Sequence, residues 1–117
     1  MLIGTLSELT GCRPHQLRYY EAQGLLEAER SSNGYRRYSV DTVPVVQLIQ
    51  SLLAVGVSVS DIRQILPSLN QKDERRRWTD LYPILRTRLN AIDRQIHDLH
   101  IARRVLVDCI EEIGDQP

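Results

Sequence analysis

The sequence predicts a mainly α-helical protein in which a winged helix-turn-helix domain is followed by one long helix. Three features carry this prediction: two short helical segments joined by a tight turn, a basic and aromatic hairpin after them, and an apolar stripe along the last third of the chain. A chain of 117 residues has room for one compact domain and one extended element. We expect the winged helix-turn-helix over residues 1–70, a linker over 71–77, a coiled-coil dimerisation helix over 78–113 and a short tail over 114–117.

The composition is that of an ordinary folded protein, with 42% apolar and 26% charged residues. The sequence has no run of about 18 apolar residues and no secretion signal, so we expect a cytoplasmic protein without membrane contact. Cys12 and Cys109 lie far apart in the sequence, which favours reduced thiols. Because the formal net charge is zero, any positive surface for nucleic acid has to be local.

The first two helical segments form a helix-turn-helix candidate. The first helix is expected over Thr5–Thr10, with Gly11 placed where a helix C-terminus favours glycine. Pro14 suits the first position of the second helix. At 100° of rotation per residue, one side of that helix carries Leu17, Tyr20 and Gly24. A second helix of this kind can present its other face to the major groove of DNA. That face carries His15, Arg18, Tyr19 and Ala22.

A basic and aromatic hairpin, which we call the wing, is expected over residues 29–38. Asn33 and Gly34 would supply the positive φ angles of its tight turn. Basic side chains on such a hairpin can hold the sugar-phosphate oxygens of DNA, which position a protein without reading the sequence.

A third and a fourth helix are expected after the wing. The third follows Ser39 or Asp41 and ends at Gly56; Pro44 favours the later start, because a proline in the first turn removes no helical hydrogen bond. The fourth helix runs through Leu66. Its expected cap and acidic first-turn residue are Ser58 and Asp61, and the residues expected to end it are Pro67 and Asn70.

From Trp78 onward the chain carries apolar residues at alternating spacings of three and four, which is the pattern of a helix that packs along a seam. The short N-terminal helices cannot cover so long a stripe, so we expect a second copy of the chain to cover it, in a parallel or an antiparallel dimer. Arg103 alone interrupts the stripe. The predicted dimer interface consists of Tyr82, Leu85, Leu89, Ile92, Ile96, Leu99, Leu106, Ile110 and Ile113.

Over about residues 3–66 the chain resembles the MerR family of bacterial transcription regulators, in a short form without a separate effector domain. The residues that carry the resemblance are Ile3-Gly4, Leu17-Arg18-Tyr19-Tyr20-Glu21, Gly24-Leu25-Leu26, Asn33-Gly34-Tyr35-Arg36, Tyr38-Ser39, Gly56-Val57-Ser58 and Asp61-Ile62. The resemblance implies an antiparallel coiled-coil homodimer on a pseudo-palindromic promoter with a long spacer. It also implies that the dimer distorts this DNA so that RNA polymerase engages both hexamers, which is regulation through DNA shape.

The candidate DNA contacts lie on the second helix, at its start and on the wing. A major groove could receive the side chains of Arg18 and Tyr19. Arg13 stands where the family usually has Ser or Thr as helix cap, and we hypothesise that Arg13 and the helix N-terminus bind one DNA phosphate together. The full set of candidates is Arg13, His15, Arg18, Tyr19, Arg36, Arg37 and Tyr38.

Other functions and ligands are less well supported by the residues. No catalytic motif stands out, so we expect no enzyme and no cofactor. Metal-sensing relatives use paired cysteines, whereas here Cys109 has no second cysteine near it; His97 and His100 lie beside the seam, and we expect no metal site. A small-molecule effector at the dimer interface, or none, remains open. The alternative function is a winged-helix and coiled-coil module that binds protein instead of DNA.

Overall fold

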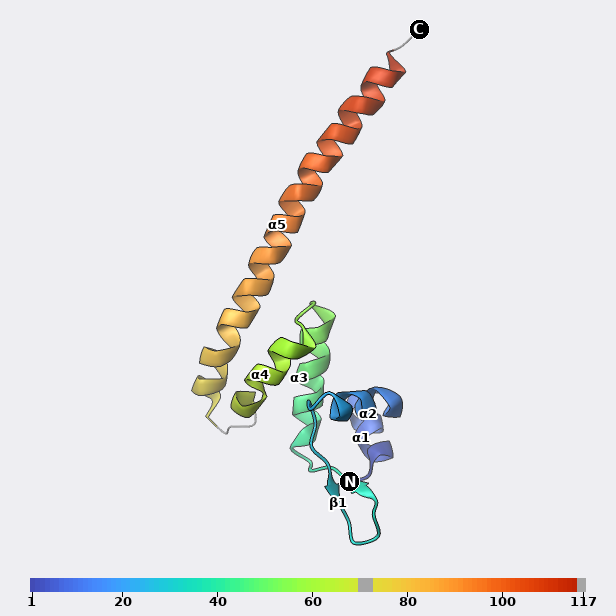
Figure 1. Ribbon diagram of the computed structural model, residues 1–117, viewed down its shortest axis with the longest axis vertical. Helices are drawn as coiled ribbons and strands as arrows, with labels where there is room; N and C mark the ends of the chain where they lie inside the picture. Colours follow the sequence, from blue (N-terminus) through green and yellow to red (C-terminus); the bar gives the residue numbers. More distant parts are fainter. Residues whose placement is uncertain (70–72, 116–117) are drawn as a thin grey trace. The chain divides into compact units, whose positions relative to one another are not determined.

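The computed structural model describes residues 1–69 and 73–115 and divides the chain into two compact units, Met1–Ile84 and Leu85–Pro117. The mainly α-helical class and the winged helix-turn-helix are confirmed (Figure 1). The elements, in chain order, are α1 (Ile3–Thr10), α2 (Pro14–Ala22), β1 (Glu29–Arg30), β2 (Arg36–Arg37), α3 (Thr42–Ala54), α4 (Val59–Leu69) and α5 (Glu74–Gly114).

One apolar core holds the first unit together, and every helix from α1 to α4 contributes to it, as does the start of α5. Helical spacing places Leu6, Leu17, Val46, Ile49 and Ile62 inward, where each is fully buried. Burying a side chain of this size stabilises the fold by about 1.5–3 kcal/mol. The short helices therefore depend on one another and not on their own helix propensity.

The ends of α1 and α2 depend on glycines. Helix α1 begins at Ile3, two residues before the predicted start, and Ile3 packs partly against the core. Gly11 ends it with a φ of 72°, as predicted. Helix α2 starts at Pro14 as predicted but ends at Ala22, so the prediction that Gly24 shares its buried face is wrong. Gly24 instead has a φ of 77° in the turn after the helix, where its N–H donates to the Glu21 carbonyl at 3.0 Å.

The wing pairs β1 with β2 in antiparallel register, with Glu29 opposite Arg37 and Arg30 opposite Arg36. Its turn differs from the prediction, because Gly34 has a φ of 82° whereas Asn33 has no positive φ. The N–H of Gly34 donates to the Ser31 carbonyl at 2.9 Å, which closes a three-residue loop whose last residue is left-handed. One positive φ is enough for this loop, and glycine supplies it.

Helix α3 places Pro44 at its third position, in the first turn, as the sequence predicts. Asp41 is the N-cap residue, which confirms the later of the two predicted starts, although its side chain makes no capping hydrogen bond. The Ser39 hydroxyl oxygen accepts a hydrogen bond from the Asp41 N–H at 3.2 Å instead. At the other end, Gly56 has a φ of 87° and follows the helix at the predicted place.

Helix α4 is capped as predicted, since the Ser58 hydroxyl oxygen accepts from the Asp61 N–H at 3.1 Å. The predicted end is wrong, because the helix continues through Pro67 to Leu69. Pro67 lies in the last turn, where it removes the backbone hydrogen bond to the Arg63 carbonyl and its ring crowds that carbonyl, so other contacts have to hold this turn. The buried Leu66 and a hydrogen bond from the Ser68 hydroxyl to Asp80 of α5 hold this turn. The predicted stop at Asn70 lies outside the described residues.

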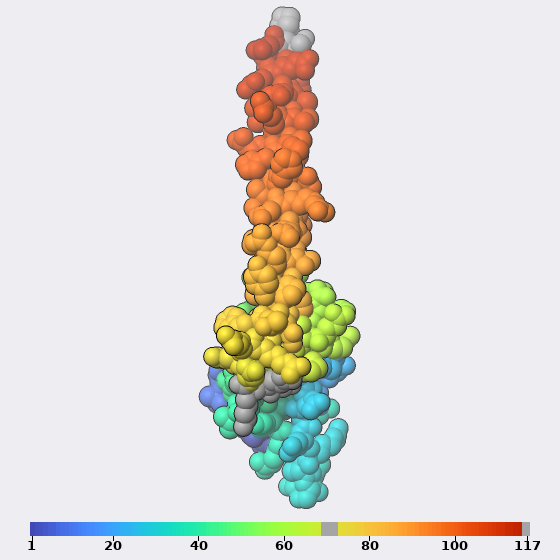
Figure 2. Space-filling view, turned by 90° about the vertical axis from the view of Figure 1, so that its left-hand side faces the viewer, coloured from blue at the N-terminus to red at the C-terminus, as the bar shows by residue number. Residues whose placement is uncertain are grey.

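Helix α5 begins at Glu74, four residues before the predicted start at Trp78. The Asp73 carboxylate accepts a hydrogen bond from the Arg75 N–H at 3.1 Å and so caps the helix, which the sequence analysis missed. Leu81 is 7% exposed and completes the core of the first unit. The second unit consists of the rest of this one helix, shown in orange and red in Figure 2.

The glycines of α1 give a matched stability test. Gly4 lies within the helix and Gly11 follows it with a φ of 72°, and an added methyl group meets nothing within 4 Å at either position. We expect Gly4→Ala to raise the free energy of unfolding by up to about 1 kcal/mol and Gly11→Ala to lower it by about 1 kcal/mol. Urea denaturation measures both. A change of the same sign in the two variants would contradict the assigned backbone conformations.

Candidate nucleic-acid interface

Helix α2 has one buried and one exposed face. Leu17 and Tyr20 are 0% and 6% exposed and belong to the core, as predicted. His15, Arg18 and Tyr19 are exposed, and the Tyr19 side chain shows 52% of its surface. The helix can therefore present a guanidinium, a phenol and an imidazole together on its outer face.

The start of α2 has no side-chain acceptor at its cap position. Arg13 is exposed there, and its guanidinium has only hydrogen-bond donors, so it cannot accept a bond from the first turn. Gln16 reaches back instead, and its side-chain oxygen accepts from the Arg13 N–H at 3.3 Å. Cys12 is fully buried beside Gln16, and burial raises the pKa of its thiol. This cysteine is a core residue.

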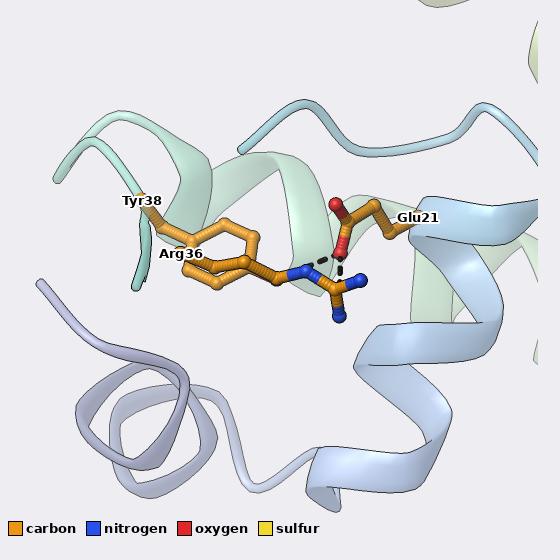
Figure 3. Close-up of polar contacts among 3 residues, drawn as sticks. All are labelled: Glu21, Arg36 and Tyr38. Carbon is orange, nitrogen blue, oxygen red and sulfur yellow. Dashed lines mark hydrogen bonds and ion pairs between the residues drawn. The ribbon is translucent and has the colours of Figure 1, made fainter. Parts of the chain in front are cut away.

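The carboxylate of Glu21 links α2 to the wing (Figure 3). The Tyr38 hydroxyl donates to its Oε2 atom at 3.1 Å, and the Arg36 guanidinium lies 3.5 Å from the same oxygen. Two side chains from the end of the wing therefore converge on one oxygen near the end of α2. Charged hydrogen bonds are stronger than neutral ones, so this contact favours one arrangement of the wing on the helix.

Tyr38 is 2% exposed, which contradicts the expectation that it is a DNA contact on the wing surface. Its ring belongs to the core, and its backbone N–H donates to the Met1 carbonyl at 2.7 Å. Burial raises the pKa of its phenol, and the nearby Glu21 carboxylate raises that pKa further, while Arg36 and Arg18 lower it. Tyr38 thus stays protonated at neutral pH, and its hydroxyl donates a hydrogen bond to the Glu21 carboxylate.

The rest of the wing is open and basic. Arg37 is exposed, and the Arg36 side chain keeps 41% of its surface accessible despite its ion pair. Two further residues of the wing were not among the candidate DNA contacts predicted from the sequence. Arg30 lies opposite Arg36 across the strands, and Tyr35 is 64% exposed in the loop. The predicted hairpin could have indicated Arg30, because residues opposite one another on paired strands have neighbouring side chains.

A second contact joins α4 to the residue that follows α2. The Arg63 side chain of α4 donates to the Gln23 carbonyl at 2.8 Å and to the Gln23 side-chain oxygen at 3.2 Å. Gln23 is the residue that directly follows α2. The end of the helix is therefore held both by Arg63 and, through Glu21, by the wing.

Within the described ranges, no three His, Cys, Asp or Glu side chains come together as a possible metal site. Nor does any described helix combine the length and the apolar character needed to cross a membrane. The predicted seam residues from Leu85 to Ile113 all lie in the second unit, and most of them are exposed in the single chain.

Two family models match the chain. The model described as "MerR HTH family regulatory protein" matches residues 1–69, and the model described as "MerR, DNA binding" matches residues 45–109. The chain belongs to the MerR family. It is a DNA-binding transcription regulator of the MerR type, so the resemblance seen in the sequence is confirmed.

Curated MerR-family relatives match the chain over most of its length. The HTH-type transcriptional regulator HmrR of Rhizobium leguminosarum bv. viciae is 40% identical over 106 residues, which are 91% of this chain and 81% of the relative. The mercuric resistance operon regulatory protein of Bacillus cereus is 33% identical over 110 residues, which are 93% of this chain and 82% of the relative.

Solved structures share the fold. PbrR691 from Ralstonia metallidurans CH34, in complex with lead(II), superposes with a TM-score of 0.74 at 23% identity, over 92% of this chain and 83% of that one. HiNmlR, a MerR family regulator that lacks the sensor domain and is bound to promoter DNA, superposes with a TM-score of 0.59 at 23% identity, over 91% of this chain and 77% of that one.

Tyr38→Phe tests the contact between Tyr38 and Glu21. Removing the hydroxyl should lower the free energy of unfolding by about 1–3 kcal/mol, because the carboxylate loses its donor. The raised pKa of Tyr38 stabilises the fold below the ordinary value of 10.0, and this stabilisation is lost as the pH rises through the raised pKa.

Urea denaturation at neutral and at alkaline pH checks both effects. Tyr38→Phe should lose less stability between the two than the parent chain does. The exposed Tyr19→Phe serves as the control and should behave like the parent. Equal alkaline losses in the parent and in Tyr38→Phe would show that Tyr38 is not the responsible group.

Proposed function

We propose that the chain binds promoter DNA as a homodimer, with α2 of each copy in the major groove and the wing against the adjacent backbone. The contact of Glu21 with Arg36 and Tyr38 carries this proposal, because it couples the helix to the wing. Arg18 and Arg36 both lie near enough to Tyr38 to lower its pKa, so their positive charges act on one region. One duplex can meet both elements at once.

Each candidate residue has a role in this arrangement. Arg18, Tyr19 and His15 are exposed on α2 and would contact base edges. The wing would contact phosphates, which give affinity and not sequence preference. Its residues with that role are Arg36, Arg37 and the newly found Arg30 and Tyr35. Local positive charge on α2 and the wing is compatible with a net charge of zero.

The homodimer would form along α5. In the second unit, Ile96, Leu99 and Leu106 expose 49%, 69% and 62% of their surface. Burying the eight seam residues of the second unit against a second copy would supply several kcal/mol at about 25 cal/mol per Å² of apolar surface. Two copies related by a two-fold axis match a pseudo-palindromic site, which is the promoter symmetry we propose.

Regulation would follow from DNA shape. We propose that the dimer distorts the promoter spacer and so presents both hexamers to RNA polymerase in the cytoplasm. Lead(II) accompanies the structure of PbrR691, but a thiolate metal site needs two or more soft ligands. Cys109 is the exposed cysteine of this chain, so we do not extend a metal effector to it.

The alternative expected from the sequence was a module that binds protein through the same surfaces, and the match to a MerR DNA-binding model argues against it. Binding to DNA distinguishes the two. We expect the purified chain to retard its own promoter on a gel, with an affinity that falls steeply as the salt concentration rises. Absence of binding at low salt would favour the protein-binding module.

Arg18→Ala tests the role of α2. We expect it to weaken binding about 10- to 100-fold, because a base contact of this kind contributes about 1–3 kcal/mol. Arg94→Ala removes an exposed positive charge from α5 and should leave the affinity nearly unchanged. Titrations of both variants on the same duplex provide the measurement. Equal affinities would exclude Arg18 as a contact.

Arg13→Ser tests the proposed phosphate site at the start of α2. Serine restores an ordinary helix cap while it removes the guanidinium. We expect weaker binding to DNA and a salt dependence of binding that is lower by about one counterion. The free energy of unfolding should stay the same or increase. An unchanged affinity together with an unchanged salt dependence would refute a phosphate contact at Arg13.

A further inference from the structure

Glu21 is an acidic residue within a surface that we propose binds a polyanion. It follows Arg18 by three residues on α2, and residues at that spacing are neighbours on the surface of a helix. Its Oε2 atom lies 3.5 Å from the Arg36 guanidinium of the wing. A carboxylate between two proposed DNA contacts repels phosphates. Its charge therefore opposes DNA binding and has to act in another way.

The attachment of the wing to α2 does not require a negative charge at this position. The Tyr38 hydroxyl donates to Glu21 at 3.1 Å, and the neutral side-chain oxygen of a glutamine would accept the same hydrogen bond. The Tyr38 ring lies in the core, and the Tyr38 N–H donates to the Met1 carbonyl at 2.7 Å. The negative charge of Glu21 thus has its main effect on Arg36, the cation that it faces.

The guanidinium of Arg36 can serve Glu21 and a DNA phosphate at the same time. It carries five N–H donors in a planar fork, and one ion pair with a single carboxylate oxygen occupies only part of that fork. The Arg36 side chain keeps 41% of its surface accessible, whereas the Glu21 side chain keeps 24%. A phosphate can therefore reach the guanidinium from the open side, while the carboxylate holds it from the other.

A restrained guanidinium affects specific and unrelated DNA differently. A specific complex places each phosphate at one position, so a guanidinium that is already held there loses less conformational entropy on binding. Unrelated DNA is bound through charge alone and in many positions. It gains little from the restraint and still meets the repulsion of the carboxylate. Because specificity is the ratio of the two affinities, one carboxylate can raise that ratio without raising either affinity.

We propose that Glu21 is a positioning residue that determines DNA specificity. Its carboxylate orients Arg36 toward a phosphate of the specific site, and it repels DNA that cannot use this orientation. The proposal rests on the DNA binding of the proposed function and adds the residue that limits binding to unrelated DNA. Glu21 acts through Arg36 and needs no contact of its own with the duplex.

Glu21→Gln tests the proposal, because it removes the charge and keeps an acceptor for the Tyr38 hydroxyl. Titrations at one salt concentration compare the promoter of the chain's own gene with a shuffled duplex of the same length and composition. We expect the variant to bind the shuffled duplex about three- to tenfold more tightly, since one nearby like charge is lost. It should bind the promoter no more tightly than the parent chain does, so the ratio of the two affinities falls.

Glu29→Gln is the matched control. Glu29 is an exposed acid of the wing, and the ion pairs of the described residues, Arg36 with Glu21 and Arg77 with Glu74, do not involve it. Its loss should tighten binding to both duplexes equally and leave the ratio unchanged. An equal tightening by Glu21→Gln would mean that Glu21 is a repulsive charge only. That result, or an unchanged affinity of Glu21→Gln for the shuffled duplex, overturns the proposal.

Two further variants separate positioning from folding. In an Arg36→Ala background, Glu21→Gln should change the ratio by less than about twofold, because the guanidinium that it positions is absent. Glu21→Asp keeps the charge but shortens the side chain, so it should weaken promoter binding and leave binding to the shuffled duplex unchanged. A full change of the ratio without Arg36, or promoter binding by Glu21→Asp equal to that of the parent, would refute the role of Glu21.

The parent chain distinguishes a failure of this inference from a failure of the proposed function. A parent chain that binds neither duplex, or binds both equally, would refute specific promoter binding itself, and the role of Glu21 with it. A parent chain that prefers the promoter, together with a Glu21→Gln variant of the same preference, would refute the role of Glu21 alone.

Discussion

The carboxylate of Glu21 is the contact on which the proposed DNA-binding surface depends. It lies near the end of α2, and the wing residues Arg36 and Tyr38 both reach its Oε2 atom. Short hairpins are marginally stable alone, and this contact holds the wing on α2, together with the buried Tyr38 ring and the hydrogen bonds between Tyr38 and Met1. Arg63 braces the same end of α2 through Gln23. Helix α2 and the wing are thus held as one surface.

Tyr38 supports the proposed binding surface from within the core. Its ring fills the core, while its hydroxyl donates to Glu21, which also binds Arg36. The phenol stays protonated because burial and the adjacent carboxylate raise its pKa. The core of the first unit and the charge of the wing are therefore connected through a single side chain. Changes in packing around Tyr38 would alter where the Arg36 guanidinium lies.

Helix α5 serves both units of the chain. Its first turns are capped by Asp73 and contribute Leu81 to the core of the first unit, and the rest of the helix exposes the seam. A regulator that binds two half-sites needs a dimer whose geometry is unique. The apolar seam of the second unit is the surface that we propose a second copy of the chain covers.

The sequence by itself determined the family, the helices and the division of α2 into a buried and an exposed face, because helical periodicity and the glycines and prolines at helix ends are local properties. It also placed Pro44 in the first turn of α3 and Ser58 at the cap of α4. Only the tertiary structure decided that Tyr38 is buried and that Arg36 meets Glu21. Those contacts join residues 15 or more positions apart in the chain, and no local spacing indicates how far a wing folds back on its helix.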